Sequence, residues 1–86
     1  MANYKIFIKP SAAKELIRLP KKDVPRITSQ IQSLSKEPRP FGCEKLSAQE
    51  RYRIRQGTYR IVYSIEDDQL IVYVIQIAHR SEVYKK

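Results

Sequence analysis

Four arginines lie close together in the second half of the chain, at spacings that suit the chemistry of phosphate groups. Arg51, Arg53 and Arg55 occupy alternate positions, and Arg60 follows after a short turn. Alternate residues of an extended strand share one face, so the first three arginines are expected on one side of a sheet. Guanidinium groups carry forked donors that match two phosphate oxygens at once. This pattern predicts an anion-binding face, and the structural alternative is a solvated sheet face with dispersed charge.

A second group of candidate residues ends the chain. His79, Arg80 and Tyr84 follow the last apolar segment, and the sequence finishes on Lys85 and Lys86. A tyrosine offers a ring on which a base can stack and a hydroxyl that can transfer a proton. An imidazole titrates near neutral pH. We expect Arg80 and Tyr84 beside the arginine strand, with packing for Tyr84 and a structural place for His79 as the alternatives.

The net charge favours a polyanionic partner. The chain has 17 lysines and arginines against 9 acids, which gives a formal charge of +8 in 86 residues. Glu50 is the only acid between Lys45 and Glu66, so the arginines are expected to repel one another unless an anion lies among them. Such an excess indicates nucleic acid first and an acidic protein second. The candidates for nucleic-acid contacts are Lys45, Arg51, His79, Lys85 and Lys86.

The sequence predicts no metal site and no cofactor. One His and one Cys give too few ligands for a metal cluster, and Gly42 and Gly57 form no phosphate-binding loop. Asp67 and Asp68 are adjacent acids, but they lie in a predicted turn, where we expect them to be solvated.

Nothing in the sequence predicts a membrane partner or secretion. No apolar run approaches the roughly 18 residues that span a bilayer, and the N-terminus lacks the apolar core of a signal peptide. The single Cys43 allows no internal disulfide, which fits a reducing compartment. We expect a cytoplasmic protein.

The first half of the chain predicts a strand followed by two helices. Residues 3–9 alternate as a strand does. Ser11 is a good N-cap for a helix whose apolar stripe continues to the break at Pro20. Apolar residues then recur on one helical face over residues 22–35. Prolines and a glycine predict a loop over residues 36–49.

The second half predicts three strands joined by short turns. Residues 51–55 and 59–65 alternate with period two, and their apolar members should meet the helices. Residues 70–77 are nearly all apolar, as expected for a central strand covered on both faces. Short turns make these strands an antiparallel meander. We therefore predict one α+β domain over residues 1–86, with two helices packed on one face of a four-stranded sheet.

Three segments of the chain resemble the RelE/ParE toxin superfamily. Residues 51–63 (RYRIRQGTYRIVY) are similar to the superfamily signature, in which a basic strand turns at a glycine into Tyr-Arg-Ile/Leu-Val-Tyr. Residues 79–84 (HRSEVY) resemble the tail of the RelE type and separate it from the ParE type. Residues 10–16 and the break at Leu19 and Pro20 also match. The similarity covers nearly the whole chain.

The resemblance implies a fold, an activity and partners. It implies a compact RelE-like fold, similar to that of microbial ribonucleases, and the toxin component of a type II toxin–antitoxin system. Such a toxin cleaves messenger RNA in the ribosomal A site and thereby inhibits translation. A cognate antitoxin neutralises it in a toxin–antitoxin hetero-oligomer. The implied partners are therefore the antitoxin, the ribosome and messenger RNA.

The resemblance also assigns catalytic candidates residue by residue. Arg53 and Arg55 lie where the family often has two catalytic lysines, and Arg60 matches the arginine that binds phosphate after the turn. Arg80 matches the tail arginine and Tyr84 the terminal tyrosine. Arginine does not readily lose a proton. Arg53 and Arg55 therefore depart from the lysines of the family, and neither is suited to act as a general base. The implied reaction is attack by a ribose 2′-hydroxyl without a metal ion.

Two other functions stay open at this point. A ParE-like protein that inhibits a topoisomerase by binding shares the fold and the pattern of residues 51–63 but needs no catalytic tail. A non-catalytic RNA- or protein-binding module would use the arginines only to bind phosphate. RNA cleavage products separate the nuclease from both alternatives.

Overall fold

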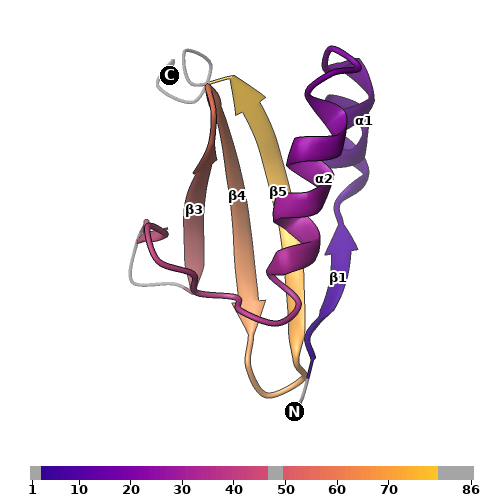
Figure 1. Cartoon of the computed structure of the whole chain (residues 1–86). Coiled ribbons are helices and arrows are strands. Elements are labelled where there is room, and N and C mark those ends of the chain that lie inside the picture. The colour runs from indigo at the N-terminus through magenta and orange to yellow at the C-terminus, as the bar shows by residue number, and fades with distance from the viewer. Residues whose placement is uncertain (1–2, 47–49, 80–86) are drawn as a thin grey trace.

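A single mixed sheet organises the molecule, with two helices on one of its faces (Figure 1). The computed structural model describes residues 3–46 and 50–79. Its elements are β1 (Lys5–Ile8), α1 (Pro10–Arg18), α2 (Val24–Ser33), β2 (Glu44–Lys45), β3 (Arg51–Gln56), β4 (Tyr59–Glu66) and β5 (Ile71–His79). The strand order is β1-β5-β4-β3-β2. The α+β class and the antiparallel meander of β3, β4 and β5 are confirmed.

The described part of the sheet has five strands, one more than the four predicted. The additional strand, β2, pairs antiparallel with β3, with Glu44 opposite Arg53 and Lys45 opposite Tyr52. It lies in the segment predicted as loop, because two residues are too few to show a periodic pattern. β1 pairs in parallel with β5, so the N-terminal strand lies at the other edge of the sheet.

Both helices have a proline in their first turn and no side-chain cap. α1 begins at Pro10 with Lys9 as its N-cap residue, so the prediction of Ser11 as N-cap is wrong. Proline suits this place because its φ is already helical and the N–H that it lacks has no intrahelical partner there. α2 carries Pro25 in its first turn and is shorter at both ends than predicted. No helix in the described part of the chain is long and apolar enough to cross a membrane.

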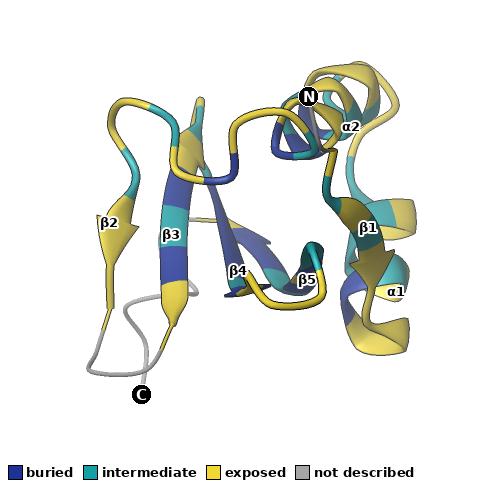
Figure 2. Ribbon diagram, turned by 90° about the horizontal axis from the view of Figure 1, so that it is seen from below, coloured by how far each residue is buried: buried dark blue, intermediate teal, exposed yellow. Residues whose placement is uncertain are grey.

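The core lies between the helices and one face of the sheet. α1 packs on β5 and α2 packs on β3. Figure 2 shows exposed residues along the outer sides of the helices and on β2, and buried residues in β3, β4 and β5. The buried core residues are Ala12, Ile27, Ile31, Leu34, Tyr52, Ile54, Ile61, Tyr63, Ile65, Val72, Val74 and Ile77. The opposite face of the sheet is left for the charged side chains.

β4, rather than β5, is the most enclosed strand. It lies in the middle of the sheet and is buried from Arg60 to Tyr63. In β5, Val72 and Val74 are buried, whereas Tyr73 between them is 43% exposed. The prediction that β5 is a central strand covered on both faces is therefore wrong.

A β-bulge between β4 and β5 explains the apolar run that misled this prediction. Tyr63 lies opposite Val74, but the preceding Val62 lies opposite Gln76, so β5 has an additional residue at this point. One additional residue turns every later side chain of the strand to the other face. Val74 before the bulge and Ile77 after it both point into the core. The core positions of β5 are therefore even-numbered before the bulge and odd-numbered after it, so apolar residues do not alternate regularly along the strand.

α1 completes the edge of β5 where β1 no longer reaches it. β1 pairs with β5 only as far as Val74. Farther along, the N–H of Ile77 donates to the carboxylate of Glu15, with 2.7 Å between N and Oε1. A helical side chain thus satisfies a strand donor that would otherwise lack a partner strand.

Candidate nucleic-acid interface

The arginines of β3 lie on the side of the sheet away from the helices. Tyr52 and Ile54 are only 6% and 5% exposed and belong to the core. Because successive side chains of a strand point to opposite faces, Arg51, Arg53 and Arg55 lie on the other side. Arg51 and Arg55 are exposed, and Arg53 is half-buried. We call this side of the sheet the arginine face.

A tight turn adds Arg60 to the arginine face. Only Gly57 and Thr58 separate β3 from β4, and Gly57 has a φ of 61°. A positive φ matches the twist of a two-residue hairpin turn, and glycine adopts it without strain. The resulting register places Arg55 directly opposite Arg60. Opposed residues of an antiparallel pair share a face, so the structure brings Arg53, Arg55 and Arg60 together.

Arg60 lies at the enclosed centre of this face. Its exposure is 4%, and Val62 and Ala78, which share the face, are also buried. Ala78 is its partner on β5. The face therefore combines one guanidinium that is largely removed from water with exposed guanidinium groups at its margin. A charge removed from water acts on an anion with less screening than an exposed charge does.

Glu44 adds an acid to the arginine face. It lies opposite Arg53 in the β2–β3 ladder and forms an ion pair with the Arg53 guanidinium. The hydrogen bond from Arg53, followed by its charge, lowers the pKa of the Glu44 carboxyl below its usual value. The expectation that no acid lies near the arginines is wrong at this position. Glu44 escaped sequence reasoning because it reaches Arg53 through a strand that shows no pattern.

Two candidate residues lie on the helix side of the sheet instead. Lys45 is opposite Tyr52, and its Nζ lies 3.0 Å from the Glu50 carboxylate. His79 is opposite Tyr59 and meets its ring edge to face, with centroids 5.8 Å apart. The bulge in β5 accounts for the place of His79, because an uninterrupted ladder would have directed it to the arginine face. The structure therefore does not join Lys45 or His79 to the arginines.

Four further candidates, Arg80, Tyr84, Lys85 and Lys86, lie outside the described residues. They follow β5 in the sequence, and β5 is the neighbour of the strand that carries Arg60. Their roles stay predictions.

Arg39, which sequence reasoning missed, fastens the loop before β2 to the sheet. Its guanidinium donates to Asp67 at 2.7 Å, to Glu50 at 3.0 Å and to the Tyr52 hydroxyl at 3.0 Å. It also lies over the Tyr52 ring, 5.3 Å from the centroid. Asp67 accepts a further hydrogen bond from Tyr4 at 2.7 Å. Contacts between residues so far apart in the chain leave no local sequence signal.

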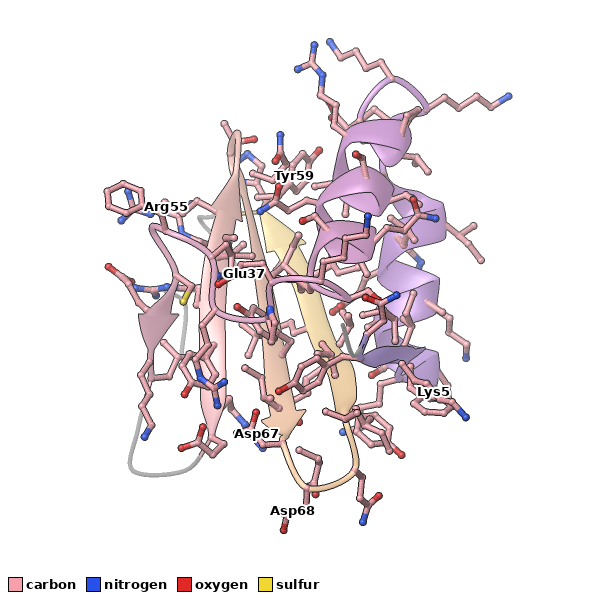
Figure 3. The ribbon with its side chains drawn as sticks, turned by 60° about the horizontal axis from the view of Figure 1, so that its bottom comes forward. Lys5, Glu37, Arg55, Tyr59, Asp67 and Asp68 are labelled. Carbon is pink, nitrogen blue, oxygen red and sulfur yellow. The ribbon has the colours of Figure 1, made fainter. Side chains whose placement is uncertain are left out.

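This network lowers the pKa of its carboxylates. Hydrogen bonds, the strongest from Tyr52, lower the pKa of Glu50 to about 2. A hydrogen bond from Arg39 is the main cause of a lowered pKa at Asp67. Asp67 lies exposed in the turn between β4 and β5, as predicted, and in addition it accepts hydrogen bonds from Arg39 and Tyr4, which the sequence did not predict. Figure 3 shows Asp67 at the end of the sheet opposite to Arg55, so the network anchors the loop far from Arg55.

Guanidinium groups supply the positive charge of the site. Within residues 3–46 and 50–79, no group of three or more His, Cys, Asp and Glu side chains is placed to bind a metal ion. Guanidinium groups bind phosphate in pairs of hydrogen bonds and stabilise negative charge that develops on it. The arrangement suits contact with a nucleic-acid backbone.

Comparisons with known proteins identify related toxins. Residues 6–84 match the model of a family described as the ParE toxin of type II toxin-antitoxin system, parDE. The chain is 28% identical over 89 residues to Toxin RelG of Mycobacterium tuberculosis, and the match covers 96% of this chain and 98% of that protein.

Solved toxin structures have the same fold. The RelBE2 toxin–antitoxin complex of Mycobacterium tuberculosis contains a chain that matches with a TM-score of 0.82 at 26% identity, over 94% of this chain and 95% of that chain. The isolated RelE toxin of E. coli matches with a TM-score of 0.79 at 26% identity, over 94% and 90% of the two chains. Sequence family and three-dimensional structure lead to the same conclusion: the chain belongs to the RelE/ParE superfamily of toxins of type II toxin–antitoxin systems.

Proposed function

We propose that this toxin is an endoribonuclease that cuts messenger RNA in the ribosomal A site without a metal ion. The observation that carries the proposal is the register of β3 and β4, which gathers Arg53, Arg55 and Arg60 on one face. Several cations around one phosphate suit a reaction that adds negative charge to phosphorus. The similarity to a RelE toxin over nearly the whole chain supports the same activity.

The proposed reaction is an internal transfer at phosphorus. The ribose 2′-oxygen gives up its proton and attacks the adjacent phosphorus, and the bond from phosphorus to the 5′-oxygen breaks. The 5′-oxygen takes up a proton from water, so the products are a 2′,3′-cyclic phosphate and a 5′-hydroxyl. Arg53, Arg55 and Arg60 stabilise the added charge as the donors of an oxyanion hole do. Loss of one preorganised donor that is shielded from water typically lowers the rate by about a hundredfold or more, and loss of an exposed donor lowers it less.

Proton transfer is assigned to the residues after β5, because arginine keeps its proton at physiological pH. Tyr84 stacks against the base or accepts the 2′ proton, and Arg80 donates a hydrogen bond to the leaving 5′-oxygen. Both roles come from the resemblance to RelE toxins, since these residues lie outside the described part of the chain. The ribosome orients the messenger RNA in line, which provides much of the rate when acid–base groups are weak.

We also propose a cognate antitoxin as the protein partner. The similar chain from Mycobacterium tuberculosis and a RelE toxin of E. coli occur in toxin–antitoxin complexes. A formal charge of +8 favours an amphipathic antitoxin segment with acidic residues. The complex should weaken as salt is added, because salt screens exposed charges.

One alternative has an observation in its favour. The matched family model describes ParE toxins, and a ParE-like protein would inhibit a topoisomerase by binding. Such a protein needs the fold and a complementary surface but no arrangement around a scissile phosphate.

Expression of the toxin alone, followed by primer extension on cellular transcripts, separates the two functions. The nuclease produces new 5′ ends inside translated frames together with arrested translation. Arg60→Ala should remove these ends, and Arg18→Ala, on α1 at the other side of the sheet, should leave them. Intact transcripts with trapped gyrase–DNA complexes would contradict the nuclease and favour the alternative.

A further inference from the structure

Phe41 presents a bare aromatic ring at the surface between α2 and β2. Its side chain is fully exposed to solvent. Among the aromatic side chains of residues 3–46 and 50–79, Phe41 is the only one that makes neither a ring contact nor a hydrogen bond. A single exposed apolar residue is common in proteins and needs no explanation by itself. Phe41 differs from such residues because its backbone is held in a turn and it lines a cavity together with Arg55.

A tight turn fixes the backbone under the ring. The N–H of Cys43 donates to the carbonyl of Pro40 at 3.1 Å, which places Phe41 and Gly42 in the middle of a four-residue turn. Gly42 has a φ of 95°, the positive value that favours glycine at the third position of such a turn. A ring on a fixed turn loses little conformational freedom when a ligand binds.

The segment before the turn is anchored to the sheet by two contacts. The carbonyl of Pro38 accepts a hydrogen bond of 2.7 Å from the hydroxyl of the fully buried Tyr63. Arg39 is held by Asp67, Glu50 and Tyr52, as described above. The loop therefore has a defined path from the end of α2 to β2.

Phe41 lines a cavity that Arg55 and Glu44 of the arginine face also line. A space of about 400 Å³ is lined by Gln30, Phe41, Gly42, Glu44, Ile54 and Arg55. It lies at the outer edge of β3, because β2 pairs only with the part of β3 at Tyr52 and Arg53. Figure 3 shows Arg55 at this edge, near the end of β3.

The lining of the cavity is less cationic and more apolar than the arginine face. It carries one carboxylate and one guanidinium, an amide, and the apolar groups of Phe41 and Ile54. Glu44, which is ion-paired with Arg53, and Arg55 are its charged members, so the cavity has no excess of positive charge. A planar, uncharged group with hydrogen-bonding edges fits this mixture, and a nucleobase is such a group.

We propose that Phe41 stacks against a nucleobase next to the phosphate bound on the arginine face, and so positions the RNA strand. The proposal rests on the proposed function for the identity of the ligand. Arg55 belongs to both the face and the cavity, so a phosphate held there directs a neighbouring base over the edge of β3 towards the ring. Stacking of one base on an aromatic side chain accounts for roughly 5- to 150-fold in affinity and tolerates any base.

Binding of an uncleavable RNA measures this contact without the chemical step. The probe is a short single-stranded RNA with 2′-fluoro groups, which lacks the attacking hydroxyl, and with 2-aminopurine as a fluorescent base. Stacking quenches 2-aminopurine, so the wild-type protein should reduce its fluorescence on binding. Phe41→Ala should raise the Kd by roughly tenfold and lose the quenching. Phe41→Trp should restore both, whereas Phe41→Leu, which is apolar without a ring, should restore neither.

Two matched variants separate stacking from charge and from general apolar contact. Ile17→Ala removes an 80% exposed apolar side chain from α1 and should bind as the wild type does. Arg55→Ala should reduce the slope of log Kd against log salt by about 0.7, as expected for one lost phosphate contact on a single strand. Phe41→Ala should leave that slope unchanged, since a ring releases no counterions.

The outcomes are distinct for this inference and for the proposed function. Equal affinity and equal quenching for Phe41→Ala and the wild type would overturn the stacking role and leave the ring to a protein contact. A wild type that binds the probe but cuts no RNA would overturn the nuclease alone. Absence of probe binding by the wild type would overturn the stacking role, whereas the nuclease is tested separately by cleavage of messenger RNA on programmed ribosomes.

Discussion

Arg55 and Arg60 allow a test in which burial sets the size of the effect. They lie opposite each other and carry the same charge, but Arg60 is 4% exposed and Arg55 is exposed. The attraction between two unit charges about 4 Å apart is roughly 4 kcal/mol at an effective dielectric constant of about 20, and roughly 1 kcal/mol in water. At about 1.4 kcal/mol for each factor of ten, these energies correspond to roughly 800-fold and roughly fivefold in rate.

We therefore predict unequal losses of RNA cleavage. Arg60→Met should lower the rate by about 10²- to 10³-fold, which agrees with the loss of one preorganised donor. Arg55→Met should lower it only about five- to tenfold, because water already screens its charge. The measurement is single-turnover cleavage on programmed ribosomes with toxin in excess, which removes binding from the rate. Arg18→Met removes an arginine from the helix side and should cleave at the wild-type rate.

Lysine variants separate the charge from its geometry. Arg55→Lys should keep most of the activity, because an exposed ammonium retains the charge. Arg60→Lys should recover little, because an enclosed ammonium lacks the planar fork and is costly to remove from water. Circular dichroism and thermal melting establish that each variant is folded. Equal losses at the two positions, or a wild-type rate for Arg60→Met, would refute the reasoning that enclosure strengthens the site.

Three further predictions concern metal ions, acid and the loop before β2. EDTA should leave cleavage unchanged when ribosome integrity is checked in parallel, and recovery of a stripped toxin by zinc or manganese alone would overturn this. Arg39→Met should lower the stability measured by urea unfolding above about pH 5, where Glu50 and Asp67 are fully charged in both folded and unfolded chains. The difference in free energy of unfolding between Arg39→Met and the wild type should shrink as the pH falls towards 2. Both carboxyls have lowered pKa values, so they become protonated and lose their attraction to Arg39 in that pH range. A difference that stays constant with pH would contradict this. Tyr63→Phe should lower the free energy of unfolding by about 1–2 kcal/mol, because the carbonyl of Pro38 loses a buried donor. An unchanged urea midpoint would count against that hydrogen bond.

The strand alternation around Arg53 is sufficient to predict the arginine face. Successive side chains of β3 point to opposite faces of the sheet. Since Tyr52 and Ile54 are the apolar members, they point towards the helices, and the arginines between them point away. The two-residue turn at Gly57 then fixes the pairing of β3 with β4, which places Arg60 opposite Arg55. Local rules are therefore enough wherever the ladder is regular.

His79 and Glu44 show where such rules stop. A single additional residue in β5 reverses the face of His79, and an almost continuous apolar sequence hides that residue. Glu44 meets Arg53 only because the loop from α2 returns along β3. That return is fixed by contacts of Arg39 and Tyr63 with distant residues, and distant contacts depend on the assembled fold rather than on spacing in the sequence.

The parallel pairing of β1 with β5 sets an order of events during synthesis. Lys5 lies opposite Ile71, so β1 has no partner strand until the chain has been made as far as β5. Translation adds roughly 5–20 residues per second, and contacts near in sequence can form in the meantime. The β3–β4 hairpin is such a contact and precedes the completed sheet. A chain interrupted before residue 71 lacks β5, the strand that flanks Arg60, so an aborted translation product carries no assembled arginine face.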